Sequence, residues 1–212
     1  MTGQAARHPL LLILLLGCFL LPSCSTLGPS TAPKGKDKVN KMIVSVKDQK
    51  MLLVSNGVPV KSYPISTSKF GIGDKPGSNC TPLGHMQVAN KIGDRAKLGA
   101  VFKSRKKTGE VLKPNAPGRD PIVTRIIWLK GLEDRNRNAY NRLIYIHGTT
   151  EEKKLGRPAS YGCIRMASKD VADLYRRVGY GADVFVIKGP IYVQEPNAAV
   201  ALLSRLTGRD EG

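Results

Sequence analysis

Residues 143–166 read LIYIHGTTEEKKLGRPASYGCIRM and combine an apolar run with a histidine and a cysteine. The run from Leu143 to Ile146 predicts a short buried strand, with His147 at its open end. Gly162 precedes Cys163, and glycine permits the tight turn that presents a side chain. This segment therefore predicts a rigid strand and a turn, followed by a helix, that hold an imidazole and a thiol.

This pair of residues allows two interpretations. An imidazole can lower the pKa of a nearby thiol or take its proton, and the thiol then becomes a nucleophile for acyl transfer. The backbone amides of Gly162 and Cys163 would in that case face the developing oxyanion. In the alternative, His147 is buried and Cys163 belongs to the core or to a disulfide with Cys80. The spacing alone leaves both interpretations open.

The rest of the chain predicts a mainly β fold with one clear helix. Apolar and β-branched runs predict strands over 42–46, 49–54, 58–66, 85–89, 122–129 and 184–187. The polar segment 93–120 predicts a long excursion with one short hairpin, and 131–141 predicts a polar connection. The residues from Arg135 to Arg142 are expected to be solvated. The helix is expected to begin with Ser168 as its N-cap and to stop at Gly179.

The N-terminus has the pattern of an export signal. Residues 10–21 are almost wholly apolar, which is too short for a transmembrane helix of about 20 residues but suits a secretory signal core. Leu21-Pro22-Ser23-Cys24 resembles the bacterial lipobox, in which Cys24 becomes the lipidated N-terminus. An ordinary signal peptide cut near Ser23 or Ser25 is the alternative. We expect an exported, periplasmic lipoprotein, and Ser25 after the cysteine favours the outer membrane.

Four segments follow from this pattern. Residues 1–23 are the predicted signal peptide, and residues 24–38, rich in Ser, Pro, Gly and Lys, form a flexible tether. Residues 39–190 are expected to form the folded domain that contains the histidine and the cysteine. Residues 191–212 form a C-terminal helix, over 197–206, and a tail.

Composition narrows the possible partners. Lys and Arg number 34 against 16 Asp and Glu, a formal charge of +18, which favours an anionic partner. Aromatic residues make up only 6% of the chain, which argues against a base-stacking nucleic-acid module. Because the sequence has no Cys-x-x-Cys and no histidine cluster, we do not expect a metal site. We expect a monomer.

The segments around His147 and Cys163 resemble the L,D-transpeptidase catalytic domain (YkuD) family. That family's signature is His-Gly-Thr followed by Ser-x-Gly-Cys-Ile-Arg-Met, matched here over 147–149 and 160–166. The opening meander over 42–67 and the Thr-Pro-x-Gly segment over 81–86 are also similar, so the resemblance covers residues 40–190. Met86, where the family usually has an aromatic residue, and the long basic segment 95–119 depart from the pattern. Tyr161 stands where some members carry histidine.

The resemblance implies a β-sandwich fold and a division of roles. Cys163 would be the nucleophile and His147 the general base and acid. A main-chain carbonyl or hydroxyl at Gly148 or Thr149 would orient the imidazole, and Gly162 would help to bind the oxyanion. The residues implied on the substrate side are Ser160, Tyr161 and Arg165, with a structural ion pair as the alternative role of Arg165.

The resemblance implies the peptide stem of peptidoglycan as the substrate and a reaction that requires no metal or organic cofactor. The thiol would attack the carbonyl that joins the diamino acid to D-alanine and form a thioester. An amine would then take the acyl group, which gives a 3→3 cross-link or attaches a protein to the wall. The alternatives are an L,D-carboxypeptidase, in which water is the acceptor, and a non-catalytic wall-binding lipoprotein. A protease acting on ordinary L-peptides is a more distant rival.

Overall fold

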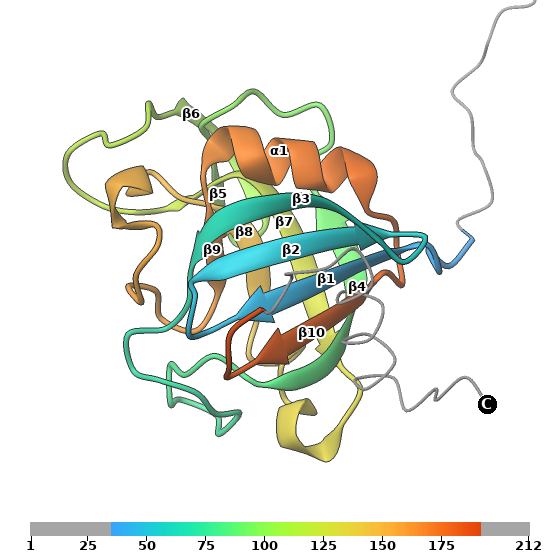
Figure 1. Cartoon of the computed structure of the whole chain (residues 1–212). Helices are drawn as coiled ribbons and strands as arrows, with labels where there is room; N and C mark the ends of the chain where they lie inside the picture. The colour runs from blue at the N-terminus through green and yellow to red at the C-terminus, as the bar shows by residue number, and fades with distance from the viewer. Residues whose placement is uncertain (1–34, 192–212) are drawn as a thin grey trace, which may run out of the picture. The chain divides into compact units, whose positions relative to one another are not determined.

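The structure is a computed structural model and describes residues 35–191 (Figure 1). Ten strands form one sheet, and one α-helix follows the cysteine, as the mainly β prediction requires. The strands are β1 Asn40–Ser45, β2 Lys50–Ser55, β3 Val58–Ser66, β4 Gly84–Ile92, β5 Ala100–Lys103, β6 Lys106–Val111, β7 Ile122–Gly131, β8 Tyr145–Gly148, β9 Ile164–Met166 and β10 Asp183–Ile187. The helix α1 is Ser168–Arg177, and the 3-10 turns are η1 Asp134–Asn136 and η2 Glu152–Lys154.

The sheet closes on itself. Its order is β4-β10-β1-β2-β3-β9-β8-β7-β5-β6, and β4 also pairs with β7. The strands from β4 to β7 therefore form a closed barrel, which leaves none of them with an unpaired edge. The β5–β6 hairpin branches from β7, where Val101 and Phe102 pair with Val123 and Ile122. This is the short hairpin expected in the basic segment 93–120.

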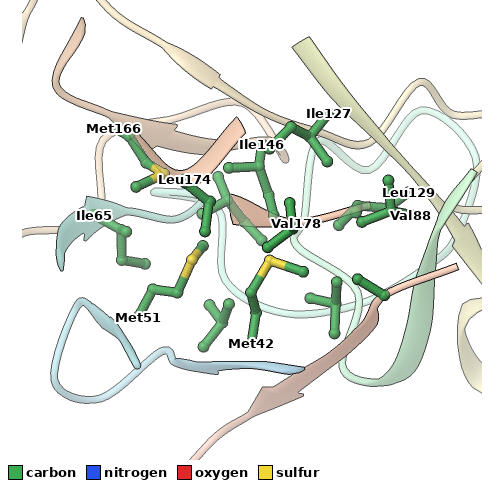
Figure 2. Close-up of a cluster of buried hydrophobic side chains, with 14 of the residues drawn as sticks. Met42, Met51, Ile65, Val88, Ile127, Leu129, Ile146, Met166, Leu174 and Val178 are labelled. Carbon is green, nitrogen blue, oxygen red and sulfur yellow. The ribbon is translucent and has the colours of Figure 1, made fainter. Parts of the chain in front are cut away.

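The barrel encloses the main apolar core. Side chains alternate between the two faces of each strand, and the inward residues of most strands meet in one cluster (Figure 2). Met42, Met51, Ile65, Ile146 and Met166 are all fully buried within it. Helix α1 adds its apolar face to the same cluster, through residues that include Leu174, and packs on β7 and β8.

The helix begins differently from the sequence prediction. Ala167 is the N-cap and Ser168 is the first helical residue, so the predicted N-cap was wrong. The Ser168 hydroxyl instead accepts a hydrogen bond from Thr124 Oγ1 at 2.8 Å. Its amide donates to the Glu152 carboxylate at 2.9 Å. A carboxylate from η2 thus satisfies the helix terminus in place of the serine.

Two local predictions around the cysteine also needed correction. The strand expected over 143–146 lies over Tyr145–Gly148, because Leu143 has a positive φ of 59° and belongs to the preceding turn. His147 therefore lies within the strand rather than after it. The cysteine does not lead directly into the helix, since the short strand β9 separates them.

The predicted signal peptide, Cys24 and the C-terminal helix over 197–206 lie outside the described residues. Of the predicted tether, only residues 35–38 are described. Within them, Asp37 accepts a hydrogen bond from the Gly179 amide at 2.6 Å, so the chain is already held against the end of α1 there. Among residues 35–191, no helix has the length and apolar character that crossing a bilayer requires.

Candidate active site

The two halves of the cysteine–histidine motif meet through a parallel strand pair. In the β8–β9 register, Ile146 lies opposite Ile164 and His147 opposite Arg165. Because Ile146 and Ile164 both point into the core, their neighbours Tyr145, His147 and Arg165 point outward. Cys163, one position before Ile164, falls at the level of Tyr145. The thiol and the imidazole therefore lie on the same outer face of the barrel.

Gly162 and Ser160 fix the turn that carries the thiol. Gly162 has a φ of 117°, a conformation that residues with a side chain rarely adopt. Ser160 is fully buried, and its hydroxyl donates to the Cys163 carbonyl at 2.6 Å while accepting from the Gly162 amide at 3.2 Å. The Gly162 carbonyl in turn accepts a hydrogen bond from Thr81 Oγ1 at 3.0 Å. The buried Ser160 hydroxyl thus holds two backbone groups of the turn in place.

The resting thiol is neutral. The Cys163 sulfur lies 3.4 Å from the Leu143 carbonyl oxygen. Burial raises the pKa of Cys163 to about 11, although the Tyr145 amide and the positive charges of Arg165 and Arg142 oppose the rise. Cys163 and Cys80 are both free thiols in this structure, so the disulfide that the sequence left open is not formed.

The imidazole has a defined orientation. His147 is 5% exposed, and its Nδ1 lies 2.8 Å from the Gly148 carbonyl oxygen. A carbonyl accepts only, so Nδ1 carries the proton and Nε2 presents a lone pair. Burial lowers the pKa of His147 to about 4; the nearby Arg165 charge contributes to the decrease, and the Gly148 hydrogen bond opposes it. A neutral imidazole with a free Nε2 is able to accept a proton.

A buried carboxylate supports the segment after His147. Asp120 Oδ1 accepts hydrogen bonds from Thr149 Oγ1 at 2.5 Å and from the Thr150 amide at 3.0 Å. Asp120 Oδ2 lies 3.1 Å from Arg165 Nη2, and Glu151 lies 3.0 Å from Nη1 of the same guanidinium. Burial by itself raises the pKa of Asp120, but the hydrogen bond from Thr149 and the Arg165 charge hold it below its usual value.

Arg165 forms the ion pairs that its alternative, structural role implies. Its side chain is 9% exposed and is shared between two carboxylates. Neither of these carboxylates, Asp120 or Glu151, was predicted from the sequence. Asp120 ends a polar loop with no motif around it, and only the closed barrel brings it beside Thr149.

Arg142 is another buried cation near the thiol. The sequence placed it in a solvated connection, which was wrong for this residue. Its side chain is 8% exposed, and Nη1 lies 3.0 Å from Asp74. It also donates to the carbonyl oxygens of Gly73, at 2.9 Å, and Cys80, at 2.7 Å. These bonds hold the 73–80 loop beside the cysteine turn.

The exposed side of the cysteine turn is aromatic. Tyr161 is 57% exposed, and its ring centroid lies 5.4 Å from that of Phe70. Lys69 donates to the Tyr161 hydroxyl at 3.0 Å and lowers the pKa of this phenol. Of the three residues expected on the substrate side, only Tyr161 faces solvent. Among residues 35–191, no three His, Cys, Asp or Glu side chains lie together as a metal site would need.

Comparison with known proteins identifies the family of this chain. Residues 40–187 match the model of the L,D-transpeptidase catalytic domain family, YkuD. A 62-residue stretch is 39% identical to a protein of Escherichia coli described as the probable L,D-transpeptidase YcfS. That stretch covers 29% of this chain and 19% of the relative.

Solved L,D-transpeptidase structures are also similar to this chain. One from Mycobacterium tuberculosis has 17% identity and a TM-score of 0.46, covering 71% of this chain and 58% of that one. One from Xylanimonas cellulosilytica has 17% identity and a TM-score of 0.46, covering 70% and 60%. One from Enterococcus faecium has 16% identity and a TM-score of 0.45, covering 71% and 50%. The chain thus spans a fifth of the curated relative and half to three fifths of these structures.

Proposed function

Because the chain belongs to the L,D-transpeptidase catalytic domain (YkuD) family, we propose that it is a peptidoglycan L,D-transpeptidase. The observation that carries the proposal is the shared outer face of β8 and the cysteine turn. There the turn that leads into β9 carries a thiol, and the neighbouring strand β8 carries a neutral imidazole with a free Nε2. A binding protein would gain nothing from this pairing, whereas acyl transfer requires a nucleophile and a base together.

The proposed reaction begins with two neutral groups. The Cys163 sulfur attacks the carbonyl carbon between the diamino acid and D-alanine, while the thiol proton passes to His147 Nε2. The carbonyl oxygen gains the negative charge. We assign its stabilisation to the amides of Cys163 and Gly162. The Gly162 amide holds only a 3.2 Å bond to Ser160, which the oxyanion would replace.

The intermediate then collapses. His147 returns its proton to the amine of D-alanine, the C–N bond breaks, and the stem remains on Cys163 as a thioester. An acceptor amine attacks the thioester carbonyl and loses a proton to His147. The C–S bond then breaks, and the sulfur takes that proton from His147 and leaves as the thiol. Throughout, the Gly148 carbonyl holds Nδ1 and stabilises the transient imidazolium. Tyr161 and Phe70 offer an exposed aromatic surface for the stem.

We also propose the setting of the reaction. The N-terminal pattern supports export, with lipid on Cys24 and a tether that allows the domain to reach the wall. Peptidoglycan stems are the proposed partners, with a wall-attached protein as a further acceptor.

The test is product analysis by mass spectrometry. Residues 25–212 are incubated with disaccharide-tetrapeptide under reducing conditions, beside a Cys163→Ala control. Loss of D-alanine with formation of a dimer, absent in the control, supports the transpeptidase. Loss of D-alanine without a dimer indicates an L,D-carboxypeptidase. No change in either sample contradicts both enzymes and favours a wall-binding lipoprotein.

A further inference from the structure

The tip of the β5–β6 hairpin is built in an uncommon conformation. The two turn residues, Ser104 and Arg105, have positive φ values of 48° and 66°. Two-residue hairpin turns of this kind usually carry Asn or Gly, because a side chain is disfavoured at positive φ. All six residues of β6 are exposed, so this strand contributes no core. The conformation does fix the direction in which Arg105 leaves the hairpin.

Arg105 reaches the outer face that carries the thiol. Its guanidinium carbon lies 5.3 Å from the centroid of the Trp128 ring. Trp128 lies opposite Tyr145 in the β7–β8 register, so both side chains share one face. Arg105 also interacts with the Tyr145 phenol, and the Tyr145 amide contacts the Cys163 sulfur. Trp128, Tyr145 and Cys163 pack in one cluster with residues of β5.

The arginines near the thiol differ in their burial and in their ion-pair partners. Arg142 and Arg165 are almost fully buried and are bound to carboxylates of the protein itself. Arg105 is exposed, and within the described part of the chain it forms no ion pair with a carboxylate. A guanidinium has five N–H donors, so Arg105 can contact the Tyr145 phenol and still offer donors to an incoming carboxylate.

We propose that Arg105 determines specificity by binding a carboxylate of the donor peptide, that of the residue released from Cys163. The inference rests on the proposed function, since it takes the scissile carbonyl to lie at the Cys163 sulfur. It also gives a role to the hairpin in the basic segment, which the sequence left without one. The hairpin then acts as an arm that selects donors with a free terminal carboxylate.

The first experiment compares two donors in the full chain: a tetrapeptide stem with a free terminal carboxylate and the same stem as its terminal amide. Arg105→Ala is expected to lower kcat/KM for the acid about tenfold to a hundredfold, the range of a charge-assisted hydrogen bond, mainly through KM. The amide is expected to change less than threefold. Arg105→Lys keeps the charge without the planar fork, and an intermediate loss is expected.

Lys107→Ala is the matched control, because it removes an exposed cation from the same hairpin two residues away. It is expected to leave the ratio between the two donors unchanged. Equal losses for acid and amide in Arg105→Ala, or the same selective loss in Lys107→Ala, would overturn the proposal.

A second readout does not depend on turnover. Iodoacetate and iodoacetamide alkylate the same sulfur, and only iodoacetate carries a carboxylate. Peptide mapping reports the rate at Cys163 separately from Cys80. Arg105→Ala is expected to lower the iodoacetate-to-iodoacetamide rate ratio at least threefold, with no change in Lys107→Ala. An unchanged ratio counts against Arg105 even if the chain proves to be a transpeptidase, whereas a lowered ratio without turnover counts against the transpeptidase alone.

Discussion

Replacing Asp120 with asparagine tests whether the segment after His147 depends on a buried charge. The side chain of Asp120 is 10% exposed, and that of its partner Arg165 is 9% exposed. Asparagine keeps an oxygen for the Thr149 and Thr150 donors, but it removes the charge that faces Arg165. Removing one partner of a buried pair costs about 3–5 kcal/mol. Because Glu151 still pairs with Arg165, we expect the lower end, about 3 kcal/mol.

That magnitude is measurable by thermal denaturation. For a domain of this size, each kcal/mol shifts Tm by about 2–4 °C, so Asp120→Asn is expected to lower Tm by about 6–12 °C. Glu110→Gln is the matched control, because Glu110 pairs with Arg119 at the surface, where both side chains are at least 40% exposed. An exposed pair contributes about 0.2–1 kcal/mol, a shift of less than about 4 °C.

Activity should fall together with stability, and for a geometric reason. Thr149 follows the Gly148 carbonyl that orients His147 Nδ1, and Asp120 holds Thr149 in place. A loosened ring is expected to lower kcat about tenfold or more, with KM little changed. If Asp120→Asn unfolds within 1 °C of the parent chain and keeps its kcat, the buried network has no supporting role and this reasoning is refuted.

Three further predictions concern the motif itself. Gly162→Ala adds a side chain at a φ of 117°, 3.3 Å from the Cys80 carbonyl oxygen. We expect the free energy of unfolding to fall by about 1–3 kcal/mol and the alkylation of Cys163 to slow. The control Gly109→Ala, at a positive-φ site with open space around it, should keep the alkylation rate. Because burial raises the pKa of Cys163 to about 11, the rate of its alkylation should climb between pH 7 and 10, and a plateau below pH 8 would contradict a neutral resting thiol. Burial lowers the pKa of His147 to about 4, so protonating this residue is less favourable in the folded state than in the unfolded state. The free energy of unfolding should therefore fall by about 3 kcal/mol as the pH drops from about 6.5 to 4. Acid unfolding curves of His147→Gln should lack this part of the loss.

Much of the fold could be predicted because local patterns and tertiary packing agree. The 58–66 strand is predicted with its observed ends, since Asn56-Gly57 leaves only one turn before it. The run from Leu143 to Ile146 was displaced by two residues, because hydrophobicity does not reveal the positive φ of Leu143. Three-residue β9 was not predicted at all. Its pairing with β3 and β8 is non-local, and so short a segment carries no periodicity.

Some residues of the site could be predicted from the sequence and others could not. His147, Cys163 and Gly162 could be singled out because their chemistry or backbone freedom is unusual for their positions, whereas Ser160 was implied only by the family resemblance. Asp120 could not, since a carboxylate in a polar loop is ordinary until the fold places it beside Thr149. The burial of Arg142 was predicted wrongly for the same reason, because only the three-dimensional structure shows its partner Asp74.

The spacing of the motif has a physical cause in the topology. Parallel strands cannot be joined by a tight turn and need a connection of about a dozen residues or more. Strands β8 and β9 are parallel, and the chain between them runs from Thr149 to Cys163. The segment returns past β3, where the Ser66 hydroxyl donates to the Arg157 carbonyl at 2.7 Å. The connection between the two parallel strands therefore sets the distance in sequence between His147 and Cys163. Shortening this connection should move the base and the thiol apart, although both residues would still be present.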